Sequence, residues 1–582
     1  MLMLNLRLSS VIFQAPLWLM LSPVCFAGGQ QPANPFGPNV LLLTPELNPA
    51  SMQAEVDRIY AQQEHSEFGP GRYAILLMPG SYPLNIPVGF YTQVLGLGLT
   101  PDAVRVSGDV HADASLPNNN ATCTFWRSAE GFTVLPATGT MQWAVSQGVS
   151  LRRMHIAGSL VLDQNHGWAS GGWLSDSAID GTVDSGTQQQ WISRNVDWKN
   201  WTGANWNMVF VGVNHPPAGQ WPHPPYTVVA TAPVTREKPF LVYAAGSWEI
   251  IVPKLRHHSS GPGWSKGSTP GRRVPLSRFY VAHADSDTSA TLNAALKQGK
   301  NLLFTPGIYN LTSSLEVTHK DAVVFGLGFA TLHASAGEPA MRIADVAGVT
   351  VSGLLFEAGV KRSPSLLEVG VAGHHERHAS NPISLHDVFF RVGGAMPGSV
   401  DADLIVNADD TLIDDTWIWR ADHGTGVGWN LNPSSNGLIV NGNFVTAYGL
   451  FVEHHQQFQT LWNGEYGRVY FYQSEIPYRL PSQAAWRSAA NTNGWASYKV
   501  TPNVRHHEAW GLGIYSVFMT PHVTLTRAIE VPRTPGVRFH HMLTTALVNH
   551  GAIEHVINNT GATAHPAPDR NTPTVAEYPT SP

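Results

Sequence analysis

Short hydrophobic stretches separated by Gly, Asn and Asp run through most of the chain. Each is rich in Val, Ile, Leu, Phe and Trp, and the clearest are residues 148–157, 190–196, 207–213, 348–356, 382–390, 411–419 and 444–452. Branched and aromatic residues in runs of this length, bounded by turn residues, are typical of β-strands. The pattern therefore predicts an all-β chain.

A turn residue recurs inside the strand pattern of the second half. Gly353, Asp387, Asp415 and Gly449 follow one another at steps of 34, 28 and 34 residues. Coils of roughly 20 to 35 residues are typical of a parallel β-helix. A β-sandwich would show hairpins at shorter intervals with Asn-Gly or Asp-Gly turns, which are scarce here. We therefore expect a right-handed parallel β-helix.

The same arrangement of motifs occurs twice. A hydrophobic strand, a Pro-Gly-x-Tyr turn and a Gly-Leu-Gly turn follow one another in residues 73–82 and 94–100, and again in residues 301–309 and 324–330. A helix-compatible stretch precedes each copy, at residues 48–62 and 288–297. Two agreements in the same order indicate that a whole domain is duplicated. The expected fold class is all-β, with two right-handed parallel β-helix domains in tandem.

The predicted domain boundaries follow composition. Residues 1–27 have one cation, an apolar stretch and small residues before a cleavage point, as in a secretory signal peptide. We expect an N-terminal β-helix domain over residues 28–258, a Pro/Gly/Ser-rich linker over 259–275, a C-terminal β-helix domain over 276–560 and a loose tail over 561–582. The protein is then secreted or periplasmic. After cleavage Cys123 is its only cysteine, so no intramolecular disulfide can form.

Composition narrows the possible ligands. Only 13% of the residues are charged, the net charge is −6 and no block of Lys and Arg occurs, which argues against nucleic acid and anionic membranes as partners. The chain also holds 19 Trp and 26 His. Aromatic faces beside neutral hydrogen-bonding groups suit a neutral glycan, and large β-structures also bury many aromatics. Composition alone leaves both interpretations open.

Acidic residues gather in one part of the second half. Between residues 414 and 475 they are Asp414, Asp415, Asp422, Glu453, Glu465 and Glu475. Glu475 follows Glu453 by 22 residues, about one coil, so the two carboxylates can stack at about 4.8 Å on one face. Neighbouring carboxylates raise each other's pKa, which can keep one protonated as a general acid. Glycoside hydrolysis needs such an acid and a basic partner.

Three short motifs in this region resemble those of a known family. Val-Glu-His-His at residues 452–455, Tyr-Phe-Tyr-Gln-Ser-Glu-Ile-Pro-Tyr at 470–478 and Ala-Asp-His at 421–423 resemble the signature of glycoside hydrolase family 55, the tandem β-helix β-1,3-glucanases. The resemblance implies an inverting hydrolase of a neutral polysaccharide, β-1,3-glucan above all. It also implies that Glu475 is the general acid and that Glu453 belongs to the network around the attacking water. Ser474 and Ile476 depart from the family pattern, where two threonines stand.

Other predicted site residues surround these two glutamates. The candidates for substrate binding or water positioning are Gln190, Asn195, Trp419, Asp422, His423, His454, Gln473 and Tyr478. Adjacent histidines on a strand point to opposite faces, so each His-His pair offers one ligand at most to one site, and we expect no metal and no cofactor. The expected partner is a polysaccharide, with no nucleic acid and no membrane, and the protein is expected to be a monomer.

Two other functions stay open at this point. A polysaccharide lyase on the same fold would need a base and a cation to neutralise a uronate, for which Arg152, Arg153 and the histidines are available. The acidic and aromatic character of residues 414–475 argues against binding an acidic polymer. The second alternative is a non-catalytic glycan-binding surface protein.

Overall fold

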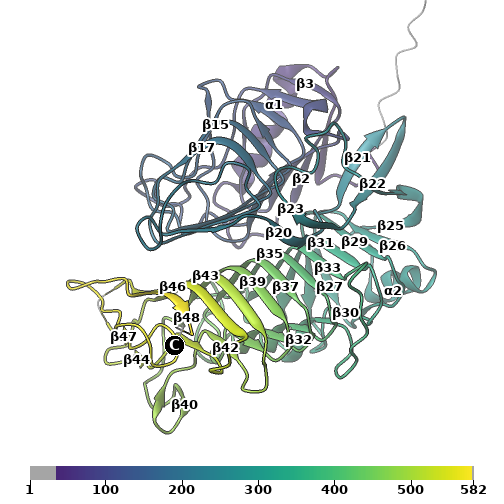
Figure 1. Ribbon diagram of the computed structural model, residues 1–582. Helices are drawn as coiled ribbons and strands as arrows, with labels where there is room; N and C mark the ends of the chain where they lie inside the picture. The colour runs from purple at the N-terminus through teal and green to yellow at the C-terminus, as the bar shows by residue number, and fades with distance from the viewer. Residues whose placement is uncertain (1–33, 549, 580–582) are drawn as a thin grey trace, which may run out of the picture. The chain divides into compact units, whose positions relative to one another are not determined.

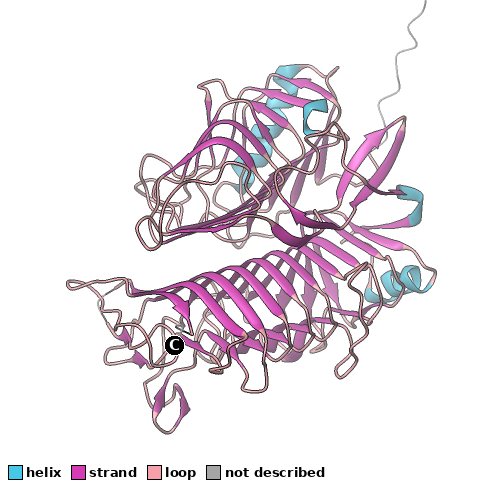
Figure 2. Cartoon of the chain, in the orientation of Figure 1, coloured by secondary structure: helices cyan, strands magenta, loops and turns pink. Residues whose placement is uncertain are grey.

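Strands dominate the chain, with few helices (Figure 2). The structure is a computed structural model that describes residues 34–548 and 550–579, so the predicted signal peptide lies outside the described residues. These described residues form one compact unit that contains both halves of the duplication. None of the helices in the described ranges is long and apolar enough to cross a membrane.

The first half coils into two parallel sheets. Neighbours in the larger sheet are β1 (Val40–Leu43), β2 (Tyr73–Leu77), β5 (Thr92–Gly96), β8 (Arg127–Glu130), β11 (Val149–Arg152), β14 (Trp173–Ser175), β16 (Gln190–Arg194), β18 (Asn207–Val211) and β19 (Tyr226–Val229). The second sheet contains β3 (Gly80–Tyr82), β6 (Val104–Ser107), β9 (Thr133–Leu135), β12 (His155–Ile156), β15 (Ala178–Asp184), β13 (Ser159–Val161), β10 (Thr140–Gln142) and β17 (Asp197–Thr202). Parallel pairing of successive coils is what a β-helix requires.

The second half repeats the arrangement with longer strands. Its larger sheet runs through β25 (Phe279–Ala282), β26 (Asn301–Phe304), β29 (Val323–Ala334), β31 (Thr350–Ala358), β33 (Ser384–Val392), β35 (Leu412–Arg420), β37 (Thr446–Glu453), β39 (Gly467–Glu475), β43 (His507–Ser516) and β46 (Val537–Ala546). The other sheet contains β28 (Leu315–Val317), β30 (Met341–Ile343), β32 (Ser363–Val369), β34 (Val400–Val406), β36 (Ser434–Val440), β38 (Thr460–Trp462), β42 (Tyr498–Val500) and β45 (Ile529–Glu530). Figure 1 shows the strands of the larger sheet stacked side by side, from green to yellow. The prediction of tandem parallel β-helices is confirmed.

The recurring turn residues lie inside the strands. Gly353, Asp387, Asp415 and Gly449 have φ values of 68°, 49°, 66° and 64°. The pairing passes over them: Ser352 pairs with His386, and the next pair is Leu354 with Val388. An unpaired left-handed residue bends a strand as a β-bulge does. The spacing of these residues in the sequence is therefore the spacing between the bends of successive coils.

Equivalent tyrosines demonstrate the duplication. The Tyr82 hydroxyl donates to the carbonyls of Leu43 and Met78, at 3.0 and 2.7 Å. The Tyr309 hydroxyl donates to Ala282 and Thr305, at 2.8 and 3.0 Å. In each half the tyrosine of the Pro-Gly-x-Tyr turn therefore ties its turn to the preceding coil.

A helix covers one end of each hydrophobic core. In α1 (Pro49–Gln63) the Asn48 side chain caps the first turn, and in α2 (Ser289–Lys297) Thr288 and Thr291 form a capping box. Apolar side chains of each helix, such as Val56 and Leu292, are fully buried in the core of the same half. Both helices were predicted, and their positions agree with the prediction.

Two predicted boundaries are wrong in part. The predicted linker, residues 259–275, contains β24 (Gly271–Pro275), which pairs antiparallel with β22 (Ser247–Pro253). The predicted loose tail, residues 561–582, contains β48 (Thr574–Tyr578), which pairs antiparallel with β46. Proline and glycine in both segments suggested loops, but each strand satisfies its backbone groups at a sheet edge.

Aromatic side chains fill the contact between the two β-helices. Trp126 and Trp173 from the first half and Trp417 and Trp419 from the second belong to one buried cluster. The ring centroids of Trp126 and Trp417 are 4.7 Å apart, as are those of Trp417 and Trp419. Much of the aromatic content of the chain is therefore packing at this contact.

Buried ion pairs also join the halves. The Arg194 guanidinium donates to both carboxylate oxygens of Asp414, each at 3.0 Å, and to Glu237 at 2.8 and 2.7 Å. Arg152 donates to Asp387 at 2.7 Å and to Asp414 at 3.0 Å. Asp414, the first acid of the 414–475 stretch, thus belongs to the contact between the halves.

Candidate active site

The two predicted glutamates end neighbouring strands. Glu453 is the last residue of β37 and Glu475 is the last residue of β39. Phe451 pairs with Gln473, and the His454 amide donates to the Glu475 carbonyl at 2.9 Å, so Glu453 and Glu475 occupy equivalent positions one coil apart. Trp419 pairs with Glu453 from the preceding strand, β35. The predicted stacking is confirmed.

A ladder of polar residues from the first β-helix faces these strand ends. Leu151 pairs with Leu174 and Trp173 with Ile192, which places Gln147, Ser170 and Gln189 one coil apart. A cavity of about 270 Å³ lies between this ladder and the glutamates. It is lined by Thr122, Cys123, Phe125, Gln147, Ser170, Gln189, Trp417, Trp419, Asp422, His423, Glu453, His454, Glu475, Tyr478 and Leu547.

Both oxygens of Glu453 accept hydrogen bonds. The Gln147 amide donates to Oε1 at 3.0 Å and the Trp417 indole N–H donates to Oε2 at 2.8 Å. The Ser170 hydroxyl donates to Oε1 of Gln147 at 3.0 Å, while Nε2 of Gln147 also donates to the Ser170 carbonyl at 3.3 Å. These partners fix the orientation of the amide, because the opposite orientation would place oxygen against oxygen.

Glu475 has a different set of partners. The Tyr478 hydroxyl donates to its Oε2 atom, and the nearest donor to Oε1 is the Gln473 amide at 3.5 Å. Its side chain lines the cavity, and the residue is 8% exposed. Of the two Glu475 oxygens, Oε1 therefore has the weaker protein contact and is the one free to hold a proton.

The two carboxyl groups hold a proton near neutral pH. Burial raises the pKa of Glu475 to about 7. Burial and the neighbouring Glu475 charge raise the pKa of Glu453 well above its usual value. Close carboxylates titrate as a pair. Because both oxygens of Glu453 already accept hydrogen bonds, we assign the shared proton to Glu475.

Asp422 and His423 form an ion pair beside the glutamates, and His454 lies next to Asp422. Against the lowering effect of burial, hydrogen bonds to Asp422, Cys123 and Glu67 raise the pKa of His423 to about 12. Against the raising effect of burial, His423 and His454 lower the pKa of Asp422 to about 2. Burial lowers the pKa of His454 to about 4, so this ring is neutral at neutral pH.

The predicted residues divide into two groups. Trp419, Asp422, His423, His454 and Tyr478 line the cavity with the two glutamates. Gln473, Gln190 and Asn195 are absent from its lining.

Two glutamine positions outside the lining still contact the site. The Gln473 amide donates to Oε1 of Glu475 at 3.5 Å. Gln190 donates to the Ser170 carbonyl at 2.5 Å, and its neighbour Gln189 is the one that reaches the cavity.

The prediction that Asn195 positions water is wrong. Its amide donates to Glu237 and to Ser259, both at 3.0 Å, within the ionic contact between the halves. Gln147 and Ser170 take the position that was expected for it and were missed. The signal that identifies them is coil spacing, since Gln147, Ser170 and Gln189 follow one another at 23 and 19 residues.

Tyr478 controls the proton on Glu475. Its hydroxyl bond favours the carboxylate and so lowers the pKa of Glu475. In Tyr478→Phe we expect that pKa to rise, which moves the alkaline limb of the pH–rate profile to higher pH. The measurement is kcat/KM as a function of pH for both proteins. An alkaline limb that stays in place or moves to lower pH would contradict the assignment.

Comparisons with known proteins agree with this geometry. A family model, the LAM55 pectate lyase-like domain, matches residues 279–475. An exo-beta-1,3-glucanase from Streptomyces sp. (strain SirexAA-E / ActE) is 45% identical over 528 residues, which are 90% of this chain and 87% of that protein.

Solved structures of sacteLam55A from Streptomyces sp. SirexAA-E also match. One is 43% identical with a TM-score of 0.92 and covers 94% of this chain and 100% of that chain. A variant of sacteLam55A in complex with glucose matches with the same identity and TM-score, over 94% of this chain and 99% of that one. The motifs, the duplicated β-helix and these similarities together show that this protein belongs to glycoside hydrolase family 55.

Proposed function

We propose that this hydrolase is an exported, monomeric exo-β-1,3-glucanase that inverts the configuration of the anomeric carbon. The single observation that supports this best is the pair of buried carboxyl groups, Glu453 and Glu475, in one cavity with different hydrogen-bond partners. Glycosidases use one carboxyl group as the acid and a second group to activate water or attack the sugar, and inversion is what the resemblance of the three motifs to family 55 implies. The Streptomyces relative is an exo-beta-1,3-glucanase, which supports β-1,3-glucan as the substrate here.

The proposed reaction assigns a role to each group. Glu475 gives its proton to the glycosidic oxygen as the bond from that oxygen to the anomeric carbon breaks. A water molecule bound by Ser170 and Gln147 attacks the anomeric carbon from the other face, and its proton passes to Glu453. Solvent exchange then removes the proton from Glu453 and returns one to Glu475. Hydrogen bonds from Gln147 and Trp417 keep Glu453 oriented to accept the proton.

The size of the cavity supports action at a chain end. Its volume of about 270 Å³ is slightly below the roughly 300–1,000 Å³ that is usual for a ligand site. A cavity this small suits one end of a glucan better than the middle of a long chain. Trp417 and Trp419 give it an apolar wall on which a sugar ring can pack.

The two arginines considered for the lyase alternative are not available to a substrate. Arg152 donates to Asp387 and Asp414 and is buried, so its charge is already neutralised within the protein. Arg153 is also buried, and its guanidinium donates to Thr269 and to the Leu99 carbonyl. Neither residue lines the cavity that holds the glutamates.

Product analysis on defined glucans tests the proposal. We expect release of glucose or a short saccharide from β-1,3-glucan, with little early loss of polymer length, and slower hydrolysis of β-1,4- and β-1,6-glucans. Mass spectrometry of the products and size-exclusion chromatography of the remaining polymer give both quantities. Rapid shortening of the polymer would contradict exo action, and an unsaturated product would contradict hydrolysis.

A further inference from the structure

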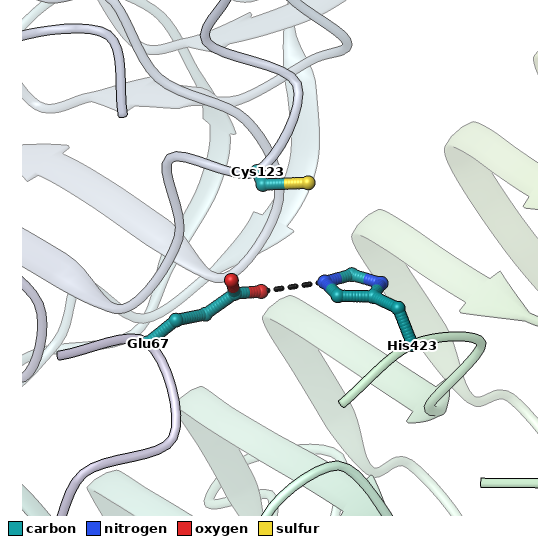
Figure 3. Close-up of side chains that lie close together, drawn as sticks. All are labelled: Glu67, Cys123 and His423. Carbon is teal, nitrogen blue, oxygen red and sulfur yellow. Dashed lines mark hydrogen bonds and ion pairs between the residues drawn. The ribbon is translucent and has the colours of Figure 1, made fainter. Parts of the chain in front are cut away.

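Three side chains at the edge of the cavity come together from distant parts of the chain. Figure 3 shows Glu67 and Cys123, from the first β-helix, directed toward His423 of the second. Their ligand atoms all lie within 4.8 Å of one another. Nε2 of His423 is 2.6 Å from Oε1 of Glu67. No sequence pattern predicted this set, because 300 residues separate Cys123 from His423.

The set has the chemistry of a zinc site. Thiolate, imidazole and carboxylate are the three ligand types that zinc prefers, at bond lengths of about 2.0–2.3 Å. Zinc ligands at tetrahedral angles are roughly 3.3–3.6 Å apart by that geometry. Glu67 and His423 would move apart slightly and Cys123 would move inward, all of them side-chain adjustments.

Asp422 supplies the supporting contact that histidine ligands usually have. Its Oδ1 atom is 2.9 Å from Nδ1 of His423, which fixes the ring and leaves Nε2 as the ligand atom. A carboxylate on the far nitrogen of a metal-binding histidine orients the ring and makes it a better ligand. The three ligands would therefore contact the metal directly, and Asp422 would hold one of them, His423, in place.

We propose that Glu67, Cys123 and His423 bind a divalent cation of the zinc class, and that the bound ion inhibits the enzyme. The ion replaces the proton between His423 and Glu67 and the proton of the Cys123 thiol, so two protons leave as three bonds to the metal form. Three protein ligands leave the fourth position for water.

Inhibition follows from the position of the site. Cys123 and His423 line the same cavity as Glu453 and Glu475. A cation beside a carboxyl group favours its ionised form, so it would remove the proton that Glu475 must donate. It would also occupy space in a cavity of only about 270 Å³. The inhibition, unlike the binding, rests on the proposed function.

Zinc and cobalt binding tests the site directly. The protein, purified without a polyhistidine tag, is titrated with ZnCl₂ by calorimetry and with CoCl₂ by absorbance, with MgCl₂ as a hard-cation control. We expect one high-affinity zinc per chain and a sulfur-to-cobalt charge-transfer band. Cys123→Ser and Glu67→Gln should each weaken zinc binding by at least about tenfold, the lower end of what changes around a metal site cost.

Matched variants separate this site from surface histidines. His374 and Glu376 are exposed and outside the cluster, and we expect His374→Gln and Glu376→Gln to bind zinc as the unchanged protein does. Equal zinc affinity in Cys123→Ser and the unchanged protein, or a cobalt complex without the sulfur band, would overturn the site.

Activity on β-1,3-glucan is measured with and without zinc. The rate of each variant in zinc is compared with the rate of the same variant without metal. Inhibition should be reversed by a chelator and should need higher zinc concentrations in Cys123→Ser. Zinc bound at the site without inhibition would overturn the inhibitory role. Failure of the proposed function would instead leave metal-free protein inactive on β-1,3-glucan while the calorimetric result stands.

Discussion

Glu475→Gln is expected to lower kcat/KM on β-1,3-glucan by about 10²- to 10⁴-fold, the usual contribution of a general acid. Glutamine keeps the size of the side chain but cannot supply a proton at the glycosidic oxygen. It can still accept the hydrogen bond that Tyr478 donates in the unchanged protein. The loss of activity is therefore expected in a folded protein. Reducing-sugar release measures the activity, and the unfolding midpoint shows whether the variant is folded.

A second acidic residue of the same stretch provides the control. Glu465 accepts hydrogen bonds from the backbone amides of Arg505 and His506 and is absent from the cavity lining. We expect Glu465→Gln to retain the activity of the unchanged enzyme. Full activity in folded Glu475→Gln would refute the assignment of the acid.

The pH dependence follows from the same proton. The acid works only while Glu475 is protonated, and burial raises its pKa to about 7. As pH rises past that value the proton is lost, and kcat/KM falls by about tenfold per pH unit. In acid, protonation of Glu453 removes the acceptor for the proton of the water, so the profile is bell-shaped.

Arg194→Met is expected to produce the largest loss of stability, about 3–5 kcal/mol of the free energy of unfolding. Arg194 is fully buried and pairs with Glu237 from the first half and Asp414 from the second. Removing the guanidinium leaves Asp414 with Arg152 as its remaining arginine partner and Glu237 with only the more distant Arg256, at 3.8 Å. Urea unfolding followed by tryptophan fluorescence measures the change.

An exposed arginine provides the comparison. Arg58 pairs with Glu55 three residues earlier on α1, and both side chains are about half exposed. Surface pairs of this kind contribute about 0.3–0.5 kcal/mol, so Arg58→Met should change the unfolding free energy little. If the two variants lost the same small amount, the ion pairs between the halves would not stabilise the protein as described.

The fold was predictable because it repeats. Gly353, Asp387, Asp415 and Gly449 recur at the coil period, and each proves to be a left-handed residue inside a strand. The same period placed Glu475 one coil after Glu453. Local sequence patterns and coil spacing are therefore sufficient to predict the wall of the site that the second β-helix provides.

The opposite wall was not predictable by the same means. Gln147 and Ser170 reach the site because the two β-helices pack together through buried tryptophans and ion pairs. The coil period predicts which residues of one β-helix stack on one another, but it does not predict which face of that β-helix packs against the second β-helix. For the same reason Asn195 was placed in the site, although its amide belongs to the ionic contact.

The central claim is that Glu475 is the acid and that Glu453 helps to activate the water. The most direct measurement compares Glu475→Gln and Glu453→Gln on β-1,3-glucan and on an aryl β-glucoside whose phenol leaves without protonation. We predict that Glu475→Gln loses activity on the glucan but keeps much of it on the aryl glucoside, while Glu453→Gln loses both. Equal losses on both substrates in Glu475→Gln, or retention of the aryl activity in Glu453→Gln, would contradict the account.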